Sequence, residues 1–492
     1  MTSASASAGP KPRRAAKVVG LPRAALECDS PTTAKIVFNQ PWTSEIYSPG
    51  GRPKQSSDLG NSERFVIAHG EDLRHCAATK RWFFWDGKRF APDATGEVKR
   101  RAKLTARGIL LEAAVQDIDK HRTELVAHQI RSESERAIRA MITLAESDKA
   151  VAVRLEDFDR DPLIFNVLNG TIDLRTQQLR EHSRDDFLTK IAPVNYEPAA
   201  TCPAWQKFLS EVLPDPEVVG FVQRAIGYSL SGDITEEAMF LLYGCGANGK
   251  SKFLEGLRYV FGDYAMTTDA GTFMVTRGQP VRNDLARLRG ARFVTAVESD
   301  AGKRLSEALI KLFTGGDTVS ARFLYSEHFE FHPNFKLWLA TNHKPRVLGT
   351  DEAIWRRIRL IPFSITIPKE LRDHKLAEKL KAESSGILNW CLAGFRDWQA
   401  GGLGEPECVS AATADYRASQ DVLGSFLAAK TDLVPNGEAR AAELYAAYRQ
   451  WTEANGEYQM TEKDFSSALV DRGFEKDRDK YGRFWKGISI RV

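Results

Sequence analysis

The sequence predicts a multidomain α/β protein with a parallel sheet at its centre. The chain has 492 residues, of which 42% are hydrophobic, so it is long enough for about three domains with sizeable cores. The apolar run MFLLY, residues 239–243, is followed directly by the glycine-rich octet GCGANGKS. Apolar residues then recur at helical spacing in KFLEGLRYVF. This order predicts a buried parallel strand, a loop and a helix.

The part of the chain before this core divides into an arm and a small domain. Residues 1–60 are rich in Ser, Ala, Pro, Gly and basic side chains without periodicity, which predicts a flexible basic arm. Residues 61–200 are expected to form an α+β domain that serves as a collar or linker. In it, RWFFWDGKRF predicts a hairpin that turns at Asp86 and Gly87, and a charged helical stretch follows from Glu97 to about Ser147.

The core is expected to span residues 201–418 and to end in helices rich in Lys and Glu. Residues 419–492 contain helices and end in YGRFWKGISIRV, which predicts a winged-helix-like C-terminal domain with a hairpin as its wing. Its basic side chains could contact phosphates, but docking of another protein explains the same composition equally well. These side chains are Arg478, Lys480, Arg483 and Lys486.

Composition narrows the class of protein. The six cysteines include no CxxC pair, which argues against a zinc site or a disulfide framework and fits a reducing cytoplasm. No apolar run approaches the length of a membrane span, and the start of the sequence lacks the apolar segment of a secretory signal, so we expect no membrane association. The net charge is only +4, so a surface for nucleic acid has to come from local clusters of basic residues.

The octet from Gly244 to Ser251 matches the pattern GxxxxGK[ST], which predicts a nucleotide-binding loop. Glycines let backbone amides converge on a phosphate, and the following helix directs its N-terminus at the anion. Lys250 would contact the outer phosphates of ATP, and the Ser251 hydroxyl would hold Mg²⁺. The residues expected to bind ATP are Gly244, Cys245, Gly246, Ala247, Asn248, Gly249, Lys250 and Ser251. The alternative interpretation is a glycine turn before a surface helix.

Hydrolysis of ATP also needs an acid next to the metal and the attacking water, at the end of a neighbouring buried strand. ARFVTAVESD supplies one, because Glu298 follows the apolar run from Phe293 to Val297. We expect Glu298 to polarise the water and to share in holding Mg²⁺, with Asp300 and Glu307 as less favoured helpers. A surface acid after a strand is the alternative interpretation.

Two later segments provide further polar groups. FKLWLATN, residues 335–342, predicts a strand that ends in Asn342, whose amide could orient the water beside the γ-phosphate. Taken alone, an Asn in this position would be assigned to a turn. WRRIRLIPF places Arg356 and Arg357 before another apolar strand, where either could complete a neighbouring subunit's site as an arginine finger. Two arginines alone would usually be assigned to a solvated surface.

A hairpin is predicted between the acid and the strand that ends in Asn342. It consists of the Gly315-Gly316 turn, a strand over 318–325, a polar tip at 326–328 and a strand over 329–331. This region has positive character, and its candidates for contact with DNA are Lys311, Arg322 and His328. Such a hairpin could equally close the edge of the sheet.

Five segments resemble, in order, the motif set of superfamily 3 helicases: GCGANGKS, AVESD, LIKLFTGGDTVSAR, FKLWLATNHKP and AIWRRIRLIPF. The similarity is closest to the primase-helicases of phages, plasmids and poxviruses. Upstream, RWFFWDGKRF, FNVLNGTIDLRTQQLREHSRDD and GYSLSGDITEE resemble segments that precede the helicase core in that group. The resemblance extends from about residue 61 nearly to the end of the chain.

The resemblance implies an AAA+ type core that assembles into a ring, usually a homo-hexamer, and unwinds DNA by hydrolysing ATP. Under it, Lys250 and Ser251 would hold phosphate and Mg²⁺, and Glu298 would be the acid of the second motif. Asn342 would be the sensor, and one of the two arginines would reach across a subunit interface. The hairpin would touch single-stranded or forked DNA in a central channel.

Family analogy also implies a setting: a phage, prophage, plasmid or satellite element in a bacterial host cytoplasm, with a primase or polymerase as a candidate partner. Primer synthesis by this chain is not expected, because only about 60 irregular residues precede the linker-like domain, without paired acids near a His or a zinc ribbon. Two other functions stay open. One is an origin-binding initiator whose ATPase only remodels DNA, and the other is a P-loop kinase acting on a small substrate. The kinase would need an acceptor pocket and a lid, for which we see no motif.

Overall fold

The computed structural model describes residues 55–275, 283–298, 302–322, 328–348, 352–435 and 437–491. These residues form two compact units. One contains the described residues up to Glu71 together with Val98–Val151, and the other contains Asp72–Glu97 and the described part of Ala152–Val492. No helix in the described ranges combines the length and the apolar character that a membrane crossing requires.

The first unit is helical, with α3 (Asp58–His69), α4 (Glu97–Ala114), α5 (Asp119–Ser132) and α6 (Glu135–Ala145). α3 begins at Asp58, inside the stretch for which the sequence predicts an irregular arm, because the Ser57 side chain accepts a hydrogen bond from Gly60 N and caps the helix. Arg64 of α3 is buried, and its Nε lies 2.6 Å from Glu112 Oε1 of α4. This buried ion pair joins α3 to α4.

Two small antiparallel sheets precede the central sheet in the second unit. The first contains β1 (Leu73–Cys76), β2 (Arg81–Trp85) and β3 (Phe90–Pro92), and the second contains β4 (Ile164–Val167), β5 (Gly170–Asp173) and β6 (Gln178–Arg180). Trp85 pairs with Phe90 across the turn at Asp86 and Gly87, so the predicted hairpin is present. The Asp86 side chain accepts a hydrogen bond from Lys88 N at 2.8 Å, which fixes the turn.

The central sheet is parallel, with the strand order β13-β7-β12-β9-β8. Its strands are β7 (Met239–Tyr243), β8 (Ala265–Asp269), β9 (Phe293–Glu298), β12 (Lys336–Thr341) and β13 (Ile358–Pro362). The chain leaves β7 for the β8 edge and returns through β9 and β12, so β12 lies between β7 and β9. The predicted multidomain α/β architecture with a central parallel sheet is therefore confirmed.

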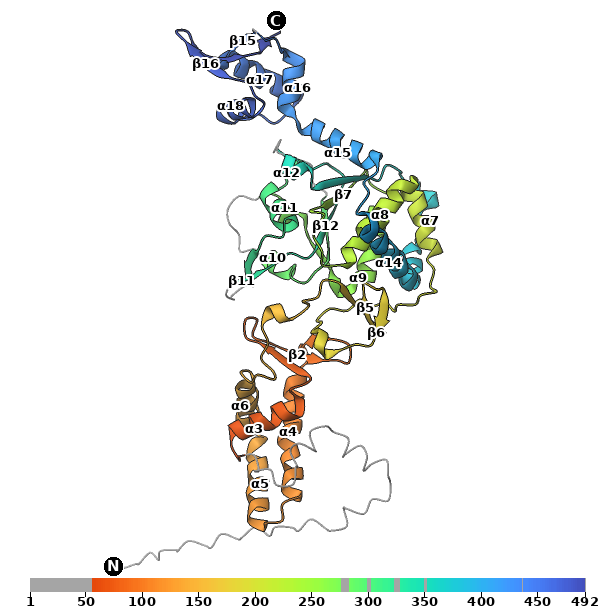
Figure 1. Cartoon of the computed structure of the whole chain (residues 1–492), viewed down its shortest axis with the longest axis vertical. Helices are drawn as coiled ribbons and strands as arrows, with labels where there is room; N and C mark the ends of the chain where they lie inside the picture. The colour runs from red at the N-terminus through yellow and green to blue at the C-terminus, as the bar shows by residue number, and fades with distance from the viewer. Residues whose placement is uncertain are drawn as a thin grey trace, which may run out of the picture. The chain divides into compact units, whose positions relative to one another are not determined.

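Helices cover both faces of the sheet (Figure 1), because alternate residues of each strand point to opposite sides. Phe240 and Leu242 of β7 belong to the core shared with α7, α8, α9, α13 and α14. Met239 and Leu241 belong to the core shared with α10, α11 and α12. The bounds of these helices are α7 Pro203–Val212, α8 Pro216–Leu230, α9 Lys250–Phe261, α10 Asn283–Arg287, α11 Glu307–Thr314, α12 Glu352–Trp355, α13 Leu376–Ala382 and α14 Ser384–Gly401. The strand before the octet and the helix after it are thus held from both sides.

The predicted hairpin after α11 is present as the antiparallel pair β10 (Val319–Arg322) and β11 (His328–Phe331). Its residues 323–327, which include most of the predicted tip, lie outside the described residues. Val319 is paired with Phe331, and both are buried in the core that contains α11. The base of the hairpin is therefore anchored in the core of the second unit.

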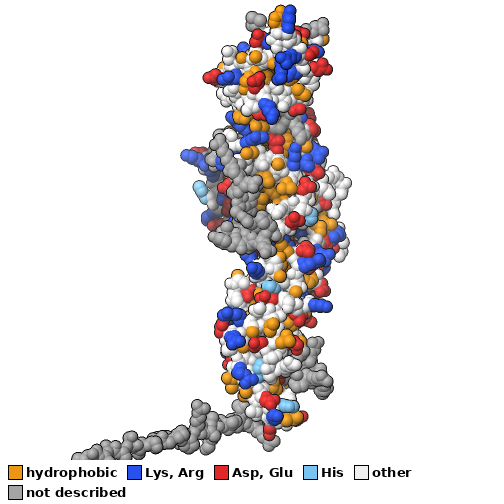
Figure 2. All heavy atoms as spheres, turned by 90° about the vertical axis from the view of Figure 1, so that its left-hand side faces the viewer, with side chains coloured by type: hydrophobic (Ala, Val, Ile, Leu, Met, Phe, Trp, Pro, Cys, Tyr) orange, Lys and Arg blue, Asp and Glu red, His pale blue; other side chains and the backbone are white. Residues whose placement is uncertain are grey.

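The C-terminal part has a core of its own, built around Phe426, Tyr448, Phe465 and Trp485. It follows α15 (Glu407–Gln420) and contains α16 (Val422–Lys430), β14 (Thr431–Asp432), β15 (Glu438–Arg440), α17 (Ala441–Asn455), α18 (Glu462–Asp471), β16 (Lys476–Asp479), β17 (Gly482–Lys486) and β18 (Ser489–Ile490). Helices followed by the β16–β17 hairpin are what the sequence predicts, whereas the identification as a winged helix stays a prediction. Figure 2 shows basic and acidic side chains interspersed over the face that it displays.

Candidate functional site

The loop between β7 and α9 has the backbone that a phosphate cradle requires. Gly249 has a φ of +87°, in the left-handed region, and is the N-cap residue of α9. A Cβ on Gly249 would lie 2.6 Å from Val212 Cγ1, and a Cβ on Gly244 would lie 2.1 Å from Phe363 O. Both positions therefore need glycine. A Cβ on Gly246, in contrast, would have nothing within 4 Å.

Lys250 begins α9, is buried, and turns its ammonium group back into the loop. Its Nζ donates to Gly244 O at 2.5 Å, to Asn248 Oδ1 at 3.1 Å and to Asn342 Oδ1 at 3.2 Å. These acceptors are neutral oxygens, and burial lowers the pKa of Lys250 from its ordinary value. A buried cation among neutral acceptors gains most from an anionic ligand, so the environment of Lys250 fits the phosphates of a nucleotide.

Glu298 and Asn342 lie at the same edge of the sheet as the loop. Thr341, the last residue of β12, is aligned with Tyr243 of β7 on one side and with Glu298 of β9 on the other. Gly244 N donates to Thr341 O at 3.4 Å, which ties the start of the octet to the end of β12. The strand order thus brings the octet, the acid and the amide to the carboxyl edge, where ligand sites of open α/β sheets lie.

The chemistry at this edge suits Mg²⁺, which prefers oxygen ligands and keeps several waters. Ser251 is exposed in the first turn of α9, and Glu298 contributes a carboxylate that is 4% exposed, with Oε1 3.5 Å from Lys303 Nζ. Together with phosphate oxygens, these groups fit the metal. Asp300 lies outside the described residues, and Glu307 lies at the start of α11, where its Oε1 is 3.9 Å from Arg304 Nη2.

Arg356 and Arg357 lie at the opposite edge of the sheet. Arg357 O accepts a hydrogen bond from Met239 N, at the start of β7, whereas the octet follows the end of this five-residue strand. The two edges are therefore roughly 15 Å apart. Both arginines contact Glu237 Oε2, Arg356 Nη2 at 3.0 Å and Arg357 Nη2 at 2.7 Å. The structure thus separates the arginines from the loop within the same chain.

The two arginines differ in their surroundings. The Arg357 side chain is only 8% exposed, and it also donates from Nε to Thr314 Oγ1 at 2.9 Å and from Nη1 to Ala353 O at 2.6 Å. The Arg356 side chain is 58% exposed. Arg357 is therefore part of the packing around β13, whereas the guanidinium of Arg356 can be reached from solvent.

The DNA-contact candidates lie in α11 and in the hairpin. Lys311 is in the last turn of α11, and Arg322 and His328 are paired at the open end of β10 and β11. The side chains of Arg322 and His328 lie outside the described residues. Contact of these three residues with DNA stays a prediction.

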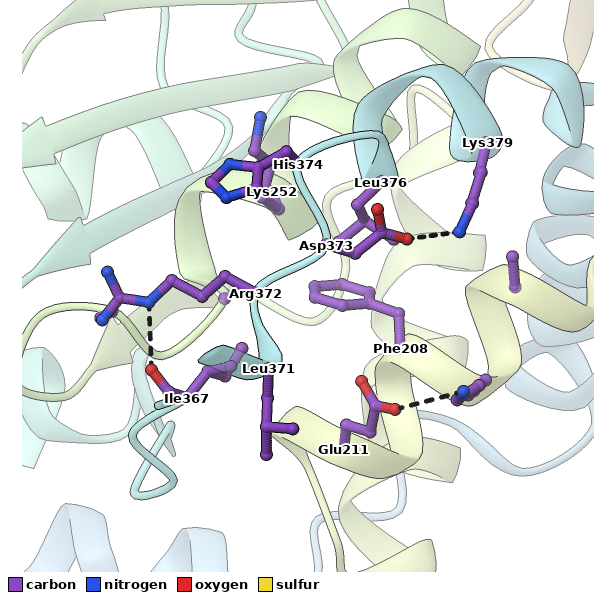
Figure 3. A pocket seen from close by; sticks show the side chains of 14 residues that line it. Phe208, Glu211, Lys252, Ile367, Leu371, Arg372, Asp373, His374, Leu376 and Lys379 are labelled. Atoms are coloured by element: carbon purple, nitrogen blue, oxygen red, sulfur yellow. Dashed lines mark hydrogen bonds and ion pairs between the residues drawn. The ribbon is translucent and has the colours of Figure 1, made fainter. Parts of the chain in front are cut away.

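A hollow of about 490 Å³ lies beside the loop, and the sequence alone did not indicate it. Figure 3 shows Phe208 of α7 and the segment from Ile367 to Lys379 around it. Ile367 N donates to Ala247 O at 2.9 Å, so the segment is fixed to the loop, and Arg372 Nε donates to Ile367 O at 3.1 Å. The lining residues are Ala204, Lys207, Phe208, Glu211, Ala247, Gly249, Lys252, Ile367, Leu371, Arg372, Asp373, His374, Leu376 and Lys379.

The charge balance of this hollow favours an anionic ligand with an apolar part. Asp373, one of its two acids, is paired with Lys379, Oδ2 to Nζ at 2.6 Å, and this contact lowers the pKa of Asp373. The other acid, Glu211, lies 3.9 Å from Lys207 Nζ, and Lys252 is paired with Glu255 outside the lining. Arg372 and His374 complete the basic side chains, and Phe208 and Leu371 are apolar groups. No local pattern could have found this hollow, because its walls come from three segments of the chain.

Two segments of the chain match known protein families. Residues 62–214 match the family described as D5 N terminal like, and residues 242–357 match a family of unknown function. The second match contains the octet, the acid, the amide and both arginines. The first match covers the segments that precede the core.

Relatives come from large DNA viruses. The chain is 29% identical over 61% of its length to a protein named as a candidate helicase, L207/L206, of Acanthamoeba polyphaga mimivirus, and 27% identical over 60% of its length to a candidate helicase, 121R, of Invertebrate iridescent virus 3. It is 21% identical over 61% of its length to a candidate primase, C962R, of African swine fever virus. The matches cover 34%, 36% and 34% of these relatives, so the chain spans about a third of their length.

A solved structure, the apo C-terminal region of NrS-1 in its A form, matches 84% of this chain and 94% of that chain, with 9% identity and a TM-score of 0.47. The sequence matches support a primase-helicase family of phages and viruses for this chain.

Proposed function

We propose that the chain is an ATP-dependent DNA helicase of a phage, prophage, plasmid or satellite element, and that it hydrolyses ATP at the interfaces of a ring. One observation carries this proposal: Lys250, Glu298 and Asn342 meet at one edge of the sheet, and Arg356 and Arg357 lie at the other. A head-to-tail interface joins two different surfaces of identical subunits, and it forms a ring when the rotation between subunits closes. Such an interface would bring an arginine of one subunit to the ATP of the next.

The roles follow from the positions of the groups. The amides of the octet and the Lys250 ammonium would hold the phosphates, and Ser251 and Glu298 would hold Mg²⁺, which neutralises charge on the phosphates when it is bound. Glu298 accepts a hydrogen bond from the attacking water, and the Asn342 amide fixes the orientation of this water. The arginine of the neighbouring subunit stabilises the charge that develops as the terminal phosphate leaves.

The hollow beside the loop is the proposed place for the nucleoside. Its apolar groups Phe208 and Leu371 can cover a base, while its basic groups lie toward the anionic part of the ligand. A hollow of about 490 Å³ is within the usual range for a small-molecule site. The hydrogen bond from Ile367 N to Ala247 O supports this placement, because it joins the wall of the hollow to the loop.

Several finer assignments belong to the same proposal. The strand order and the position of the loop after β7 support an AAA+ type core in residues 201–418. The β16–β17 hairpin supports a winged-helix-like domain in residues 419–492, in which Lys486 Nζ lies 2.7 Å from Asp477 Oδ2. That ion pair reduces the positive charge that the wing can offer to phosphates. It therefore favours the helicase proposal over an origin-binding protein that contacts DNA mainly through this wing.

The test is to measure ATP turnover and strand separation by the purified full chain with a forked DNA substrate. The proposal expects turnover that DNA stimulates and separation that needs ATP, both lost in Lys250→Ala. A small-molecule kinase would hydrolyse ATP without any response to DNA. An initiator that only remodels DNA would respond to DNA but would not separate the fork.

A further inference from the structure

A second hollow, of about 480 Å³, lies in the second unit, and none of its lining residues belongs to the octet. It is bordered by β2, by the chain around Leu155 and Lys190, by β8, by α10 and by β11. Its lining residues are Thr79, Arg81, Phe83, Pro92, Leu155, Phe158, Thr189, Lys190, Met266, Ala286, Arg287, Arg289 and Phe329. Neither the ATP site nor the tip of the hairpin includes these residues.

The charged side chains that line this hollow are all basic. Among the described residues that line it there are four cationic side chains, Arg81, Lys190, Arg287 and Arg289, and no Asp or Glu. The nearby carboxylate of Asp159 is engaged by Thr189, whose N and Oγ1 donate to it at 2.8 and 2.5 Å. Burial lowers the pKa of both Lys190 and Arg289, although the nearby Asp159 acts in the opposite direction.

The hollow also contains aromatic rings. Phe83 and Phe158 are buried, with ring centroids 4.6 Å apart, and they form an apolar floor. Phe329, from the second strand of the hairpin, is partly exposed. Cations together with an accessible aromatic ring are the combination that binds single-stranded nucleic acid, because phosphates pair with the cations and a base stacks on the ring.

An adjoining hollow of about 460 Å³ shows that this charge pattern is local. It shares Leu155, Phe158 and Arg289 with the hollow of about 480 Å³, but its lining also includes the acids Glu156, Asp159 and Glu330. Its lining also includes Arg160 and Arg289, so acidic and basic side chains are mixed there. The charge therefore distinguishes one of two connected hollows of similar size.

We propose that the hollow lined by Arg81, Arg287 and Phe329 binds a nucleotide of single-stranded DNA, with its phosphate at the arginines and its base on the phenylalanine. This inference rests on the proposed helicase function for the choice of DNA as the ligand. It adds a contact that lies outside the predicted hairpin tip. The strand would then be held by residues of the β1–β3 sheet and of the core together.

The experiment measures binding of the full chain to a fluorescent oligothymidylate of about 20 nucleotides, without ATP, by anisotropy at several salt concentrations. Arg81 and Arg287 are exposed, so their joint replacement in Arg81→Ala/Arg287→Ala leaves the core intact. Arg396→Ala is the matched control, because its side chain is 68% exposed on α14. We expect the double variant to bind about tenfold more weakly or worse, with a log–log salt slope shallower by about 0.7 for each phosphate that the arginines no longer neutralise.

Phe329→Leu tests the other half of the site. It should weaken binding by about tenfold through loss of stacking but leave the salt slope unchanged, because no cation is removed. The proposal is wrong if the arginine variant keeps wild-type affinity and slope, or if Arg396→Ala has the same effect. It is also wrong if free thymidine triphosphate competes as well as the strand does, since the site would then take mononucleotides.

The outcome is independent of the helicase assay. If the wild-type chain neither hydrolyses ATP nor separates a fork, the proposed function fails, whereas the dependence of strand affinity on Arg81, Arg287 and Phe329 can still hold. If the fork is separated with ATP and the arginine variant binds the strand normally, the helicase proposal stands and this site is refuted.

Discussion

Lys250 Nζ donates a hydrogen bond to Asn342 Oδ1 at 3.2 Å, and this contact joins the first turn of α9 to the end of β12. The two residues are far apart in the sequence, and the strand order alone brings them together. The contact gives the amide a defined position beside the group that is expected to hold the outer phosphates. A change at either residue should therefore affect hydrolysis, but in different ways.

Lys250→Ala should abolish detectable ATP turnover and weaken nucleotide binding, because it removes the cation at the phosphates. Asn342→Ala should still bind nucleotide while turnover falls by about a hundredfold, since it removes a group that orients the water and not the cradle itself. Steady-state turnover and fluorescent-nucleotide binding measure the two effects. Normal turnover in Asn342→Ala would contradict its role as the sensor.

Two glycines of the octet provide a matched pair for the cradle. Gly244→Ala places a Cβ 2.1 Å from Phe363 O, so the loop has to shift and nucleotide affinity should fall by about tenfold or more. Gly246→Ala has open space around its Cβ, so it should bind ATP like the wild type. Titration with a fluorescent ATP analogue checks both variants. An equal fall in affinity would mean that close backbone approach at Gly244 does not shape the site.

The two arginines should separate stability from catalysis. Arg357→Ala removes a buried guanidinium that contacts Glu237, Thr314 and the Ala353 carbonyl. Because Glu237 is partly exposed, we expect the free energy of unfolding to fall by only about 2 kcal/mol. Arg356→Ala should change the free energy of unfolding by less than about 1 kcal/mol. Turnover should nevertheless fall by about a thousandfold in Arg356→Ala if this arginine is the finger. Urea unfolding and an ATPase assay measure both quantities.

A mixing experiment tests whether the arginine acts on a neighbouring subunit. Arg356→Ala subunits have an intact loop, and Lys250→Ala subunits have an intact arginine. A mixed ring therefore contains some complete interfaces, and partial turnover should return. The same mixture made with Arg357→Ala covers the other arginine. Failure of both mixtures to recover turnover would argue against a shared site.

The sequence predicts the local parts of this site better than their assembly. Glycine and Lys in the octet, the apolar run before it and the helical spacing after it are local signals, and the strand, loop and helix follow from them. The placement of β12 between β7 and β9 depends on long-range pairing, which no spacing in the sequence encodes. The position of Glu298 and Asn342 at strand ends did predict that both lie near the phosphate loop, but it did not predict which strands are neighbours.

Residues with structural partners far away were missed for the same reason. Glu237 precedes β7 and gave no signal as a partner of Arg356 and Arg357, because those arginines reach it through the pairing of β13 with β7. Phe208 and Arg372 belong to one hollow although α7 and the segment after β13 are separate in the sequence. Such sites depend on the packing of side chains from several elements, which local propensity does not fix.

Lys336 makes a pH-dependent contribution to stability that the sequence did not indicate. It begins β12, is 1% exposed, donates from Nζ to Ser231 O at 2.6 Å and lies 4.2 Å from the centre of the Tyr228 ring. Burial, with a smaller effect of the neighbouring Arg292, holds the pKa of Lys336 well below its ordinary value of 10.5. The folded protein therefore releases this proton at lower pH than the unfolded chain does.

The sign of the effect follows from proton counting. Between the lowered pKa and 10.5, the unfolded chain holds a proton on Lys336 that the folded protein lacks, so stability rises with pH across this window. We expect the free energy of unfolding to rise with pH in this window below 10.5, by at most about 1.4 kcal/mol per pH unit from this residue. Lys336→Met should flatten the rise, although Lys190 and Lys250, whose pKa values burial also lowers, retain part of it. Lys463→Met, at an exposed lysine of α18, is the control. Urea unfolding of this variant should show the same change of the free energy of unfolding with pH as the wild type. If Lys336→Met shows that same change with pH, Lys336 stays protonated in the folded protein.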